Sequence, residues 1–406
     1  MNIVDIITKK KNNEELSYEE LDFAFNGYLD KDVADYQMSA LLMAITINGL
    51  SLDETINLTD IFIKSGDVYS FKKKVADKHS TGGIGDTTTL VAMPIVAACG
   101  VAVAKMSGRG LGFTGGTIDK LEAIPGFEVE MDKDDFYEQI KEIGIAICSQ
   151  SDKIVPLDKA IYSLRDVTGT TESLALIASS IISKKIACGA SYIVIDIKVG
   201  NGALIKTQEE AEILSDWMVK IGKHFKRQIE TIITPMDEPL ADSIGNALEI
   251  IEAIEVLDGK KGKLYEVSIE IAAHILAMAK NISMKDAIIL AQNAIKRGAA
   301  KKMFVRWIKA QRGILSALHV SDKVVYIRSK EEGTVEEISA INCGRLAMKL
   351  GAGRVKKNDE IDYSVGVKIL KQIGDYVKER DILAELYVAD YNFKLDEEDL
   401  NLFVIK

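Results

Sequence analysis

Short, predominantly apolar runs separated by helix-forming stretches constrain the fold of this chain more than any other feature. Three such runs cover residues 101–106, 145–149 and 192–199. Strands without polar alternation are typical of parallel sheets that are covered by helices on both faces. The pattern therefore predicts an α/β domain built on a parallel sheet.

Residues 1–65 have a helical character instead. Ser17 and Glu20 fit a capping box, which predicts a helix from Tyr18 to about Phe25. Residues 35–48 carry apolar side chains at helical spacing and predict a further helix. The N-terminal region is therefore expected to form a small helical domain.

The C-terminal part shows a third pattern, which begins near residue 332. Glycine and aspartate turns there separate the short runs GTVEEI, GVKILKQIGDYV and ILAELYVA. The predicted fold class is thus α/β, with a small helical domain, a large mixed α/β domain and a small β-rich module over residues 332–406.

Charge and apolar patterning restrict the partners and the compartment. The net charge of −10 argues against nucleic acid or an anionic membrane as a partner, since both favour a basic face. The longest apolar stretch, residues 90–104, is broken by Pro94 and Gly100, so we expect a buried helix and then a buried strand rather than a membrane span. The N-terminus lacks the apolar core of a signal peptide, and the four cysteines show no CxxC spacing, which favours the cytoplasm.

Two glycine-rich loops carry the clearest chemical signal, and the first is KHSTGGIGD at residues 78–86. Glycines allow successive backbone N–H groups to turn toward one point, and such nests bind phosphate-like anions. Lys78 would add a positive charge, while Ser80 and Thr89 would donate hydroxyl hydrogen bonds. The alternative is a tight turn followed by a threonine that caps a helix.

The second loop, SGRGLGFTGGT, follows a predicted strand and contains a GxGxxG match at residues 110–115. A nicotinamide-dependent oxidoreductase is therefore an alternative. A proline–glycine pair at residues 125–126 leaves only a short helix after the loop, which does not suit an ordinary βαβ crossover. The hydroxyls of Ser107, Thr114 and Thr117 also suit a free phosphate.

A third group of polar residues lies on or near a predicted helix over residues 171–187. Ser173, Ile177, Ser180 and Lys184 share one face of that helix by their spacing. Tyr162 and Arg165 precede it. The alternative for Lys184 and Lys185 is that they only complement the negative end of the helix dipole.

Histidines add one candidate to these groups. His79 lies within the first glycine loop, whereas His224, His274 and His319 occur in helical or mixed patterns and are expected to be surface or packing residues.

Taken together, four segments resemble the thymidine phosphorylase and pyrimidine-nucleoside phosphorylase family, in the same order and over nearly the whole chain. They read KHSTGGIGD, SGRGLGFTGGTIDKLEAIPG, YSLRDVTGTTES and SSIISKK. The resemblance implies a homodimer with a helical domain from residues 1–65 and 157–187. It also implies an α/β phosphate-binding domain from residues 70–153 and 190–330, with the nucleoside between the two domains.

The implied reaction is phosphorolysis of uridine, thymidine or deoxyuridine to the free base and an α-(deoxy)ribose 1-phosphate. Phosphate would attack the sugar directly with inversion, without an organic cofactor. The implied phosphate contacts are Lys78, Ser80, Thr89, Ser107 and Thr117. The implied pyrimidine contacts are Tyr162, Arg165, Ser180 and Lys184, with His79 near the reacting centre. His79, Arg165 and Lys184 are the implied catalytic residues.

The resemblance also suggests a substrate determinant and a metal site. Lys105 lies where thymidine-specific relatives tend to carry methionine, and it could bind the ribose 2′-hydroxyl. A potassium ion is implied at Gly85, Thr87, Leu240, Ser243 and Glu252. The remaining alternatives are a magnesium-dependent glycosyl transfer similar to that of anthranilate phosphoribosyltransferase, for which no Asp/Glu pair stands out, and anion binding without catalysis.

Overall fold

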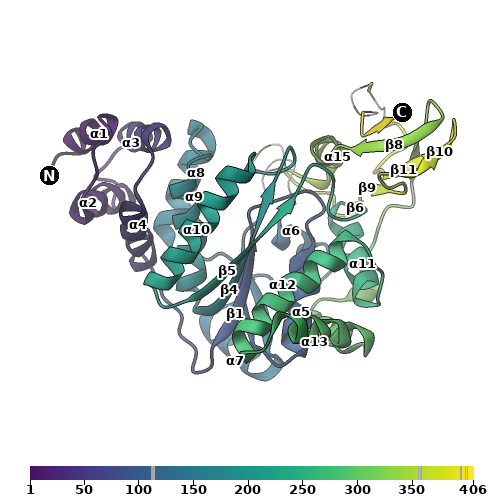
Figure 1. Cartoon of the computed structure of the whole chain (residues 1–406), viewed down its shortest axis with the longest axis horizontal. Helices are drawn as coiled ribbons and strands as arrows, with labels where there is room; N and C mark the ends of the chain where they lie inside the picture. Colours follow the sequence, from purple (N-terminus) through teal and green to yellow (C-terminus); the bar gives the residue numbers. More distant parts are fainter. Residues whose placement is uncertain (111–114, 355, 357–358, 394–395, 398, 400) are drawn as a thin grey trace.

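The molecule has three parts arranged along its long axis (Figure 1). A bundle of helices lies at the N-terminal end, a sheet with its covering helices occupies the centre, and a β-rich module lies at the far end. The computed structural model describes residues 1–110, 115–354, 356, 359–393, 396–397, 399 and 401–406. No helix of this described part is long and apolar enough to span a membrane.

The N-terminal bundle consists of four consecutive helices and two that return from later in the sequence. They are α1 (Ile3–Lys11), α2 (Tyr18–Leu29), α3 (Asp35–Asn48), α4 (Leu52–Lys64), α8 (Pro156–Thr168) and α9 (Leu174–Ala187). The predicted capping box is confirmed, because Ser17 and Glu20 bond each other's backbone N–H groups. The helix continues past Phe25 to Leu29, since Gly27 is accommodated within it beside Val33.

The central sheet has five strands in the order β3-β2-β1-β4-β5, and every pair is parallel. The strands are β1 (Val75–Ser80), β2 (Val103–Ser107), β3 (Ile145–Ser149), β4 (Ala190–Val199) and β5 (Gln228–Pro235). The predicted parallel sheet is confirmed. The three predicted strands shift by no more than two residues at either end.

Helices cover the sheet and complete the central domain. They are α5 (Thr88–Ala98), α6 (Thr117–Glu122), α7 (Lys133–Ile143), α10 (Gln208–His224), α11 (Asn246–Leu257), α12 (Lys263–Lys280), α13 (Met284–Lys296) and α14 (Ala299–Ala310). Residues 88–97 of α5 are all buried, Pro94 included, and β2 follows the helix. The expectation for the apolar stretch 90–104 is therefore confirmed.

The C-terminal module contains two small sheets with the orders β6-β9-β11-β7 and β10-β8-β12. Its elements are β6 (Ser243–Ile244), β7 (Val324–Arg328), β8 (Gly333–Ile338), α15 (Ala340–Ala347), β9 (Gly366–Ile369), β10 (Tyr376–Val377), β11 (Ile382–Tyr387) and β12 (Phe403–Ile405), with short helical turns at Leu315–Ala317 and Met348–Ala352. The β-rich character is as predicted. Strand β7 precedes the predicted boundary at residue 332, and β6 reaches the module from the central domain, because strand pairing does not follow sequence order.

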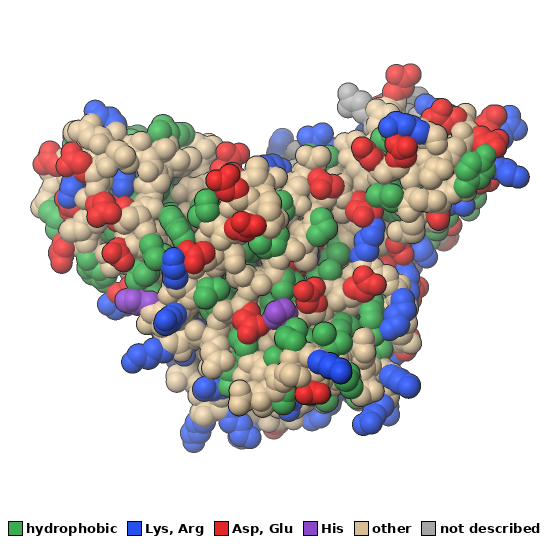
Figure 2. Space-filling view, viewed as in Figure 1, with side chains coloured by type: hydrophobic (Ala, Val, Ile, Leu, Met, Phe, Trp, Pro, Cys, Tyr) green, Lys and Arg blue, Asp and Glu red, His purple; other side chains and the backbone are tan. Residues whose placement is uncertain are grey.

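The visible surface mixes acidic and basic side chains without a broad basic area (Figure 2). Its outline is notched along the upper edge, between the helical bundle and the C-terminal module. The carboxyl ends of the parallel strands lead toward this edge in Figure 1. Ligands of open α/β sheets bind outside the carboxyl ends of the strands, so the functional residues are sought there.

Candidate active site

The predicted phosphate residues gather at the carboxyl ends of two neighbouring strands. Ser80 ends β1 and Ser107 ends β2, and the two strands pair directly. Thr89 lies in the first turn of α5, and Thr117 begins α6. Two strand ends and two helix N-termini are therefore combined, and helix N-termini attract anions.

Lys78 is the charged member of the predicted phosphate contacts, and its ion pair with Asp86 is long. Its side chain is almost completely buried, and its Nζ lies 3.8 Å from Oδ1 of Asp86. Burial lowers the pKa of Lys78, and the negative charge of Asp86 opposes that shift. An ammonium held this loosely can approach an incoming phosphate without first breaking a close ion pair.

A buried ion pair and its hydrogen bonds support the first glycine loop, and this group was not predicted from the sequence. Lys120 donates to Oε2 of Glu249 at 2.6 Å and to the carbonyl of Asp86 at 2.7 Å. Thr87 donates to the same carboxylate of Glu249 at 2.7 Å. Burial tends to raise the pKa of Asp86, but nearby lysines outweigh it and hold that pKa well below its usual range. The loop therefore keeps a fixed shape, because a buried carboxylate without these partners would be costly.

Asp77 of β1 pairs with two lysines from different segments of the chain. Lys185 of α9 lies 2.7 Å from Oδ2 of Asp77 and donates to the carbonyl of Met106. Lys105 lies 3.5 Å from Oδ1 of Asp77 and donates to the carbonyl of Lys78 at 2.6 Å. Lys185 therefore links the C-terminal end of α9 to β1 and β2. This link places the helical bundle next to the residues predicted to bind phosphate.

Burial and the lysine charges of this cluster shift the pKa values of two predicted site residues, Lys105 and His79. Burial, together with the positive charge of Lys185, lowers the pKa of Lys105 to about 7. Burial and the charges of the surrounding lysines hold the pKa of His79 well below its usual value. His79 is therefore neutral at pH 7 and can serve as a hydrogen-bonding group but not as a cation.

The predicted pyrimidine residues meet between α8 and α9. Lys184 donates to Oδ2 of Asp158 at 2.6 Å and to Oγ of Ser180 at 2.8 Å. The Tyr162 ring has Nζ of Lys184 at 5.9 Å and Cζ of Arg165 at 5.8 Å from its centroid. The arrangement offers two cations and an aromatic face, which suits a planar, polar ring that becomes negatively charged.

Arg165 belongs to this group, but most of its hydrogen bonds go to backbone carbonyls of its own segment. Its guanidinium is buried and donates to the carbonyls of Thr170 and Thr171 at 3.0 and 2.9 Å. A longer bond of 3.5 Å reaches the carbonyl of Leu176. Arg165 therefore braces the connection between α8 and α9, and two of its five N–H groups have no hydrogen-bond acceptor within the described part of the chain.

Two details of the helical prediction need correction. Helix α9 begins at Leu174 rather than at residue 171, and Ser173 is its N-cap. Ser180 and Lys184 remain on one face, as predicted. Asp158 was missed, although it lies four residues before Tyr162 and therefore on the same side of α8.

The GxGxxG alternative falls partly on residues 111–114, which lie outside the described residues, as does Thr114. The flanking positions are placed: the N–H of Gly110 donates to Oδ2 of Asp119 at 2.6 Å. Gly116 has no room for a side chain, since a Cβ there would lie 2.1 Å from the nitrogen of Gly110. Helix α6 has six residues, which agrees with the expectation of a helix too short for an ordinary dinucleotide crossover.

The residues suggested for potassium surround the join between the first glycine loop and α11. Leu240 donates its N–H to the carbonyl of Ile84, and Thr87 donates its hydroxyl hydrogen to Glu249. Glu252 accepts the N–H groups of Asp242 and Ser243 as well as an ammonium hydrogen of Lys260. The one carboxylate of the suggested set is therefore already neutralised, so these residues do not fit a dedicated potassium site.

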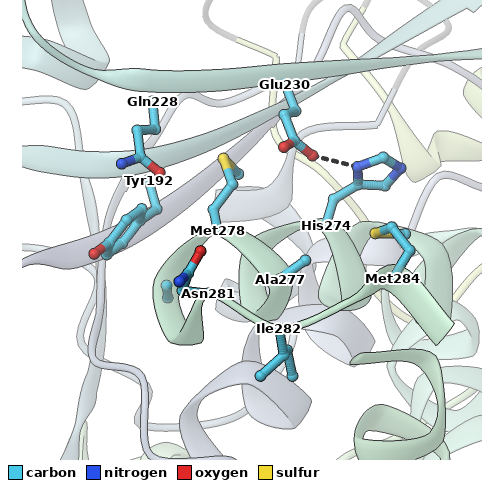
Figure 3. A pocket seen from close by; sticks show the side chains of 10 residues that line it. Tyr192, Gln228, Glu230, His274, Ala277, Met278, Asn281, Ile282 and Met284 are labelled. Carbon is cyan, nitrogen blue, oxygen red and sulfur yellow. Dashed lines mark hydrogen bonds and ion pairs between the residues drawn. The ribbon is translucent and has the colours of Figure 1, made fainter. Parts of the chain in front are cut away.

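A separate hollow of about 740 Å³ lies near the amino ends of β4 and β5 (Figure 3). Tyr192, Gln228, Glu230, Met278 and His274 line it. His274 pairs with Glu230, as the dashed line in Figure 3 indicates, which matches its expected packing role. The hollow is at the opposite end of the strands from the glycine loops, so it is not the site described above.

Known proteins match this chain over most of its length. Residues 72–301 match the a/b domain of the glycosyl transferase family, residues 4–66 match its helical bundle domain, and residues 334–400 match the pyrimidine nucleoside phosphorylase C-terminal domain. The pyrimidine-nucleoside phosphorylase of Staphylococcus haemolyticus is 46% identical over 98% of this chain and 95% of its own. The chain belongs to the pyrimidine-nucleoside phosphorylase family. The pyrimidine-nucleoside phosphorylase of Bacillus subtilis is also 46% identical, over 97% and 93%.

A solved structure from outside these phosphorylases shares the fold. Anthranilate phosphoribosyltransferase from Thermus thermophilus aligns with a TM-score of 0.61 and 17% identity, covering 76% of this chain and all of that one. At this identity the likeness concerns the fold alone.

Proposed function

We propose that this protein catalyses phosphorolysis of pyrimidine nucleosides, giving the free base and a (deoxy)ribose 1-phosphate. The observation that carries the proposal is the similarity of about 46% identity, over almost the entire chain, to proteins named for this activity. The site geometry supports it, because Lys185 joins α9, which carries predicted base contacts, to β1 and β2, which carry predicted phosphate contacts.

The reaction requires phosphate to form a bond with the anomeric carbon while the bond from that carbon to the base nitrogen breaks. The electron pair of the broken bond leaves with the base, which becomes negatively charged until it takes up a proton. The sugar becomes positively charged in the transition state, as in other glycosidic cleavages. Phosphate held by Lys78 and the strand-end hydroxyls would attack from the opposite side, with inversion and without a protein nucleophile.

Lys184 and Arg165 would stabilise the charge on the departing base. Both cations flank Tyr162, and Asp158 with Ser180 fixes the position of the Lys184 ammonium. Preorganised charges of this kind are the largest contributors to many enzymatic rate accelerations. His79, which is neutral at pH 7, would position the sugar or phosphate by hydrogen bonding.

The decisive test is release of uracil from uridine with and without inorganic phosphate. We expect uracil and ribose 1-phosphate in equal amounts, with no uracil when phosphate is omitted. Release at the same rate without phosphate would show hydrolysis instead. No release from any pyrimidine nucleoside would exclude the proposed activity.

Lys105→Met is expected to lower kcat/KM for uridine more than for thymidine, by a factor that corresponds to about 1–3 kcal/mol. The reason is that only uridine has the 2′-hydroxyl that Lys105 would bind. Steady-state kinetics on both nucleosides measures the difference. Equal losses on the two substrates would show that Lys105 does not recognise the sugar.

The same preference should depend on pH. Because the pKa of Lys105 is lowered to about 7, its side chain is charged below that pH and neutral above it. Charged donors make the stronger hydrogen bonds, so the ratio of uridine to thymidine kcat/KM is expected to fall as the pH rises from 6 to 8. In Lys105→Met the ratio should be flat over this range, and an unchanged slope in that variant would contradict the assignment.

We also propose that the protein is a cytoplasmic homodimer that associates through the helical bundle. Tyr36, Met43 and Ile47 of α3 and Val4 of the neighbouring α1 are large, apolar and exposed. Large exposed apolar side chains on two neighbouring helices are consistent with a protein interface. All four cysteines are free, which suits a reducing compartment. Light scattering of Ile47→Glu against the unmodified protein tests the dimer, and a monomeric unmodified protein would exclude it.

A further inference from the structure

A lysine ammonium lies among three carboxylates next to the segment that supports the phosphate side of the site. Nζ of Lys260 is 3.0 Å from Oε1 of Glu252, 3.0 Å from Oδ2 of Asp242 and 3.3 Å from Oε2 of Glu255. Glu252 is almost completely buried, with a relative exposure of 4%. A buried carboxylate needs a positive partner, and among the described residues Lys260 is the cation paired with it.

The chain holds this ammonium in a defined place. Lys260 follows α11 in a tight turn, where Gly259 has a φ of +110° and the N–H of Lys260 donates to the carbonyl of Glu255. The ammonium also donates a hydrogen bond to Oε1 of Glu252 at 3.0 Å.

The carboxylate that Lys260 neutralises shapes the segment before α11. Oε1 of Glu252 accepts the N–H of Asp242 at 3.2 Å, and Oε2 accepts the N–H of Ser243 at 2.7 Å. Two residues earlier, the N–H of Leu240 donates to the carbonyl of Ile84 in the first glycine loop. The backbones are so close that a Cβ on Gly85 would lie 3.0 Å from the nitrogen of Ala241. The Lys260–Glu252 ion pair thus stabilises residues 240–243, which contact the first glycine loop.

We propose that Lys260 replaces the monovalent cation that the family resemblance places beside Glu252, so that this protein needs no potassium ion for stability or activity. An added ion at Glu252 would have to approach the Lys260 ammonium, and two like charges at such short range repel each other. The kinetic part of the inference rests on the proposed function, whereas the stability part does not.

The experiment compares Lys260→Gln with the unmodified protein in potassium chloride and in tetramethylammonium chloride at equal ionic strength. The matched control is Lys263→Gln, which removes a nearby lysine that pairs with Glu238 outside this cluster. Tm is measured by calorimetry, and kcat/KM for phosphate is measured with uridine as the second substrate.

The unmodified protein and Lys263→Gln are expected to give the same Tm and the same kcat/KM in both salts. Lys260→Gln should lose about 2–4 °C in tetramethylammonium chloride and recover in potassium chloride, with a parallel loss of about tenfold in kcat/KM. If no nucleoside is cleaved, the proposed function fails, and the Tm series still decides the role of Lys260.

Three results would overturn the proposal. The first is an unmodified protein whose Tm and activity rise with potassium. The second is a Lys260→Gln variant that matches Lys263→Gln in both salts. The third is an equal loss in both salts without recovery in potassium chloride, since it would assign Lys260 a purely structural role.

Discussion

Lys184→Met is expected to lower kcat/KM for uridine by about a thousandfold, the upper range for loss of one preorganised donor that stabilises a developing anion. The ammonium is fixed by Asp158 and Ser180 beside Tyr162, so it needs no reorganisation when the base leaves. Most of the loss should appear in kcat, because the negative charge exists in the transition state and not in the bound nucleoside. Steady-state kinetics at saturating phosphate measures it.

Two further variants test this reading of Lys184. Lys220→Met on α10 removes an exposed lysine that pairs with Asp216, and it should leave the kinetics unchanged. Asp158→Asn keeps the ammonium but removes its charged partner, so it should cause a smaller loss than Lys184→Met. A Lys184→Met enzyme with a raised KM and an unchanged kcat would show that Lys184 only binds the substrate.

Lys78→Met should raise the KM for phosphate by about a hundredfold, while the KM for uridine changes little. Loss of a charge-assisted hydrogen bond to an anion is worth about 1.5–3 kcal/mol, which gives the size of the effect. Lys78 is the obvious source of this bond because its 3.8 Å separation from Asp86 leaves it available. Calorimetric titration of phosphate into the free enzyme provides a measurement that does not depend on turnover.

The control for Lys78 is Lys141→Met, which removes an exposed lysine paired with Glu138 on α7. It should bind phosphate as the unmodified protein does. Because Lys78 is buried, the Tm of the variant must be recorded as well. Unchanged phosphate affinity in a folded Lys78→Met protein would exclude Lys78 from the phosphate site.

Local sequence patterns determined the elements of this protein. Predominantly apolar runs specify buried strands because each face of a parallel strand is covered. The Ser17–Glu20 pair starts a helix because two otherwise unpaired N–H groups are satisfied within a few residues. The glycine loops can be recognised from the sequence because each is a short continuous segment. Together with two further segments they suffice to indicate the family before any geometry is known.

Tertiary structure decided which charged side chains act together. Lys184 and Asp158 are 26 residues apart in sequence, and Thr87 and Glu249 are 162 apart, so no spacing rule relates them. The family resemblance implied a pyrimidine contact for Arg165, and the fold directs its guanidinium toward the carbonyls of Thr170 and Thr171. Strand order was also decided by the tertiary structure. The lowered pKa of Asp86 and the neutral state of His79 depend on burial and on lysine charges that folding brings together. Local sequence therefore sets the secondary structure, whereas the electrostatics of the site arise only when distant segments are packed out of water.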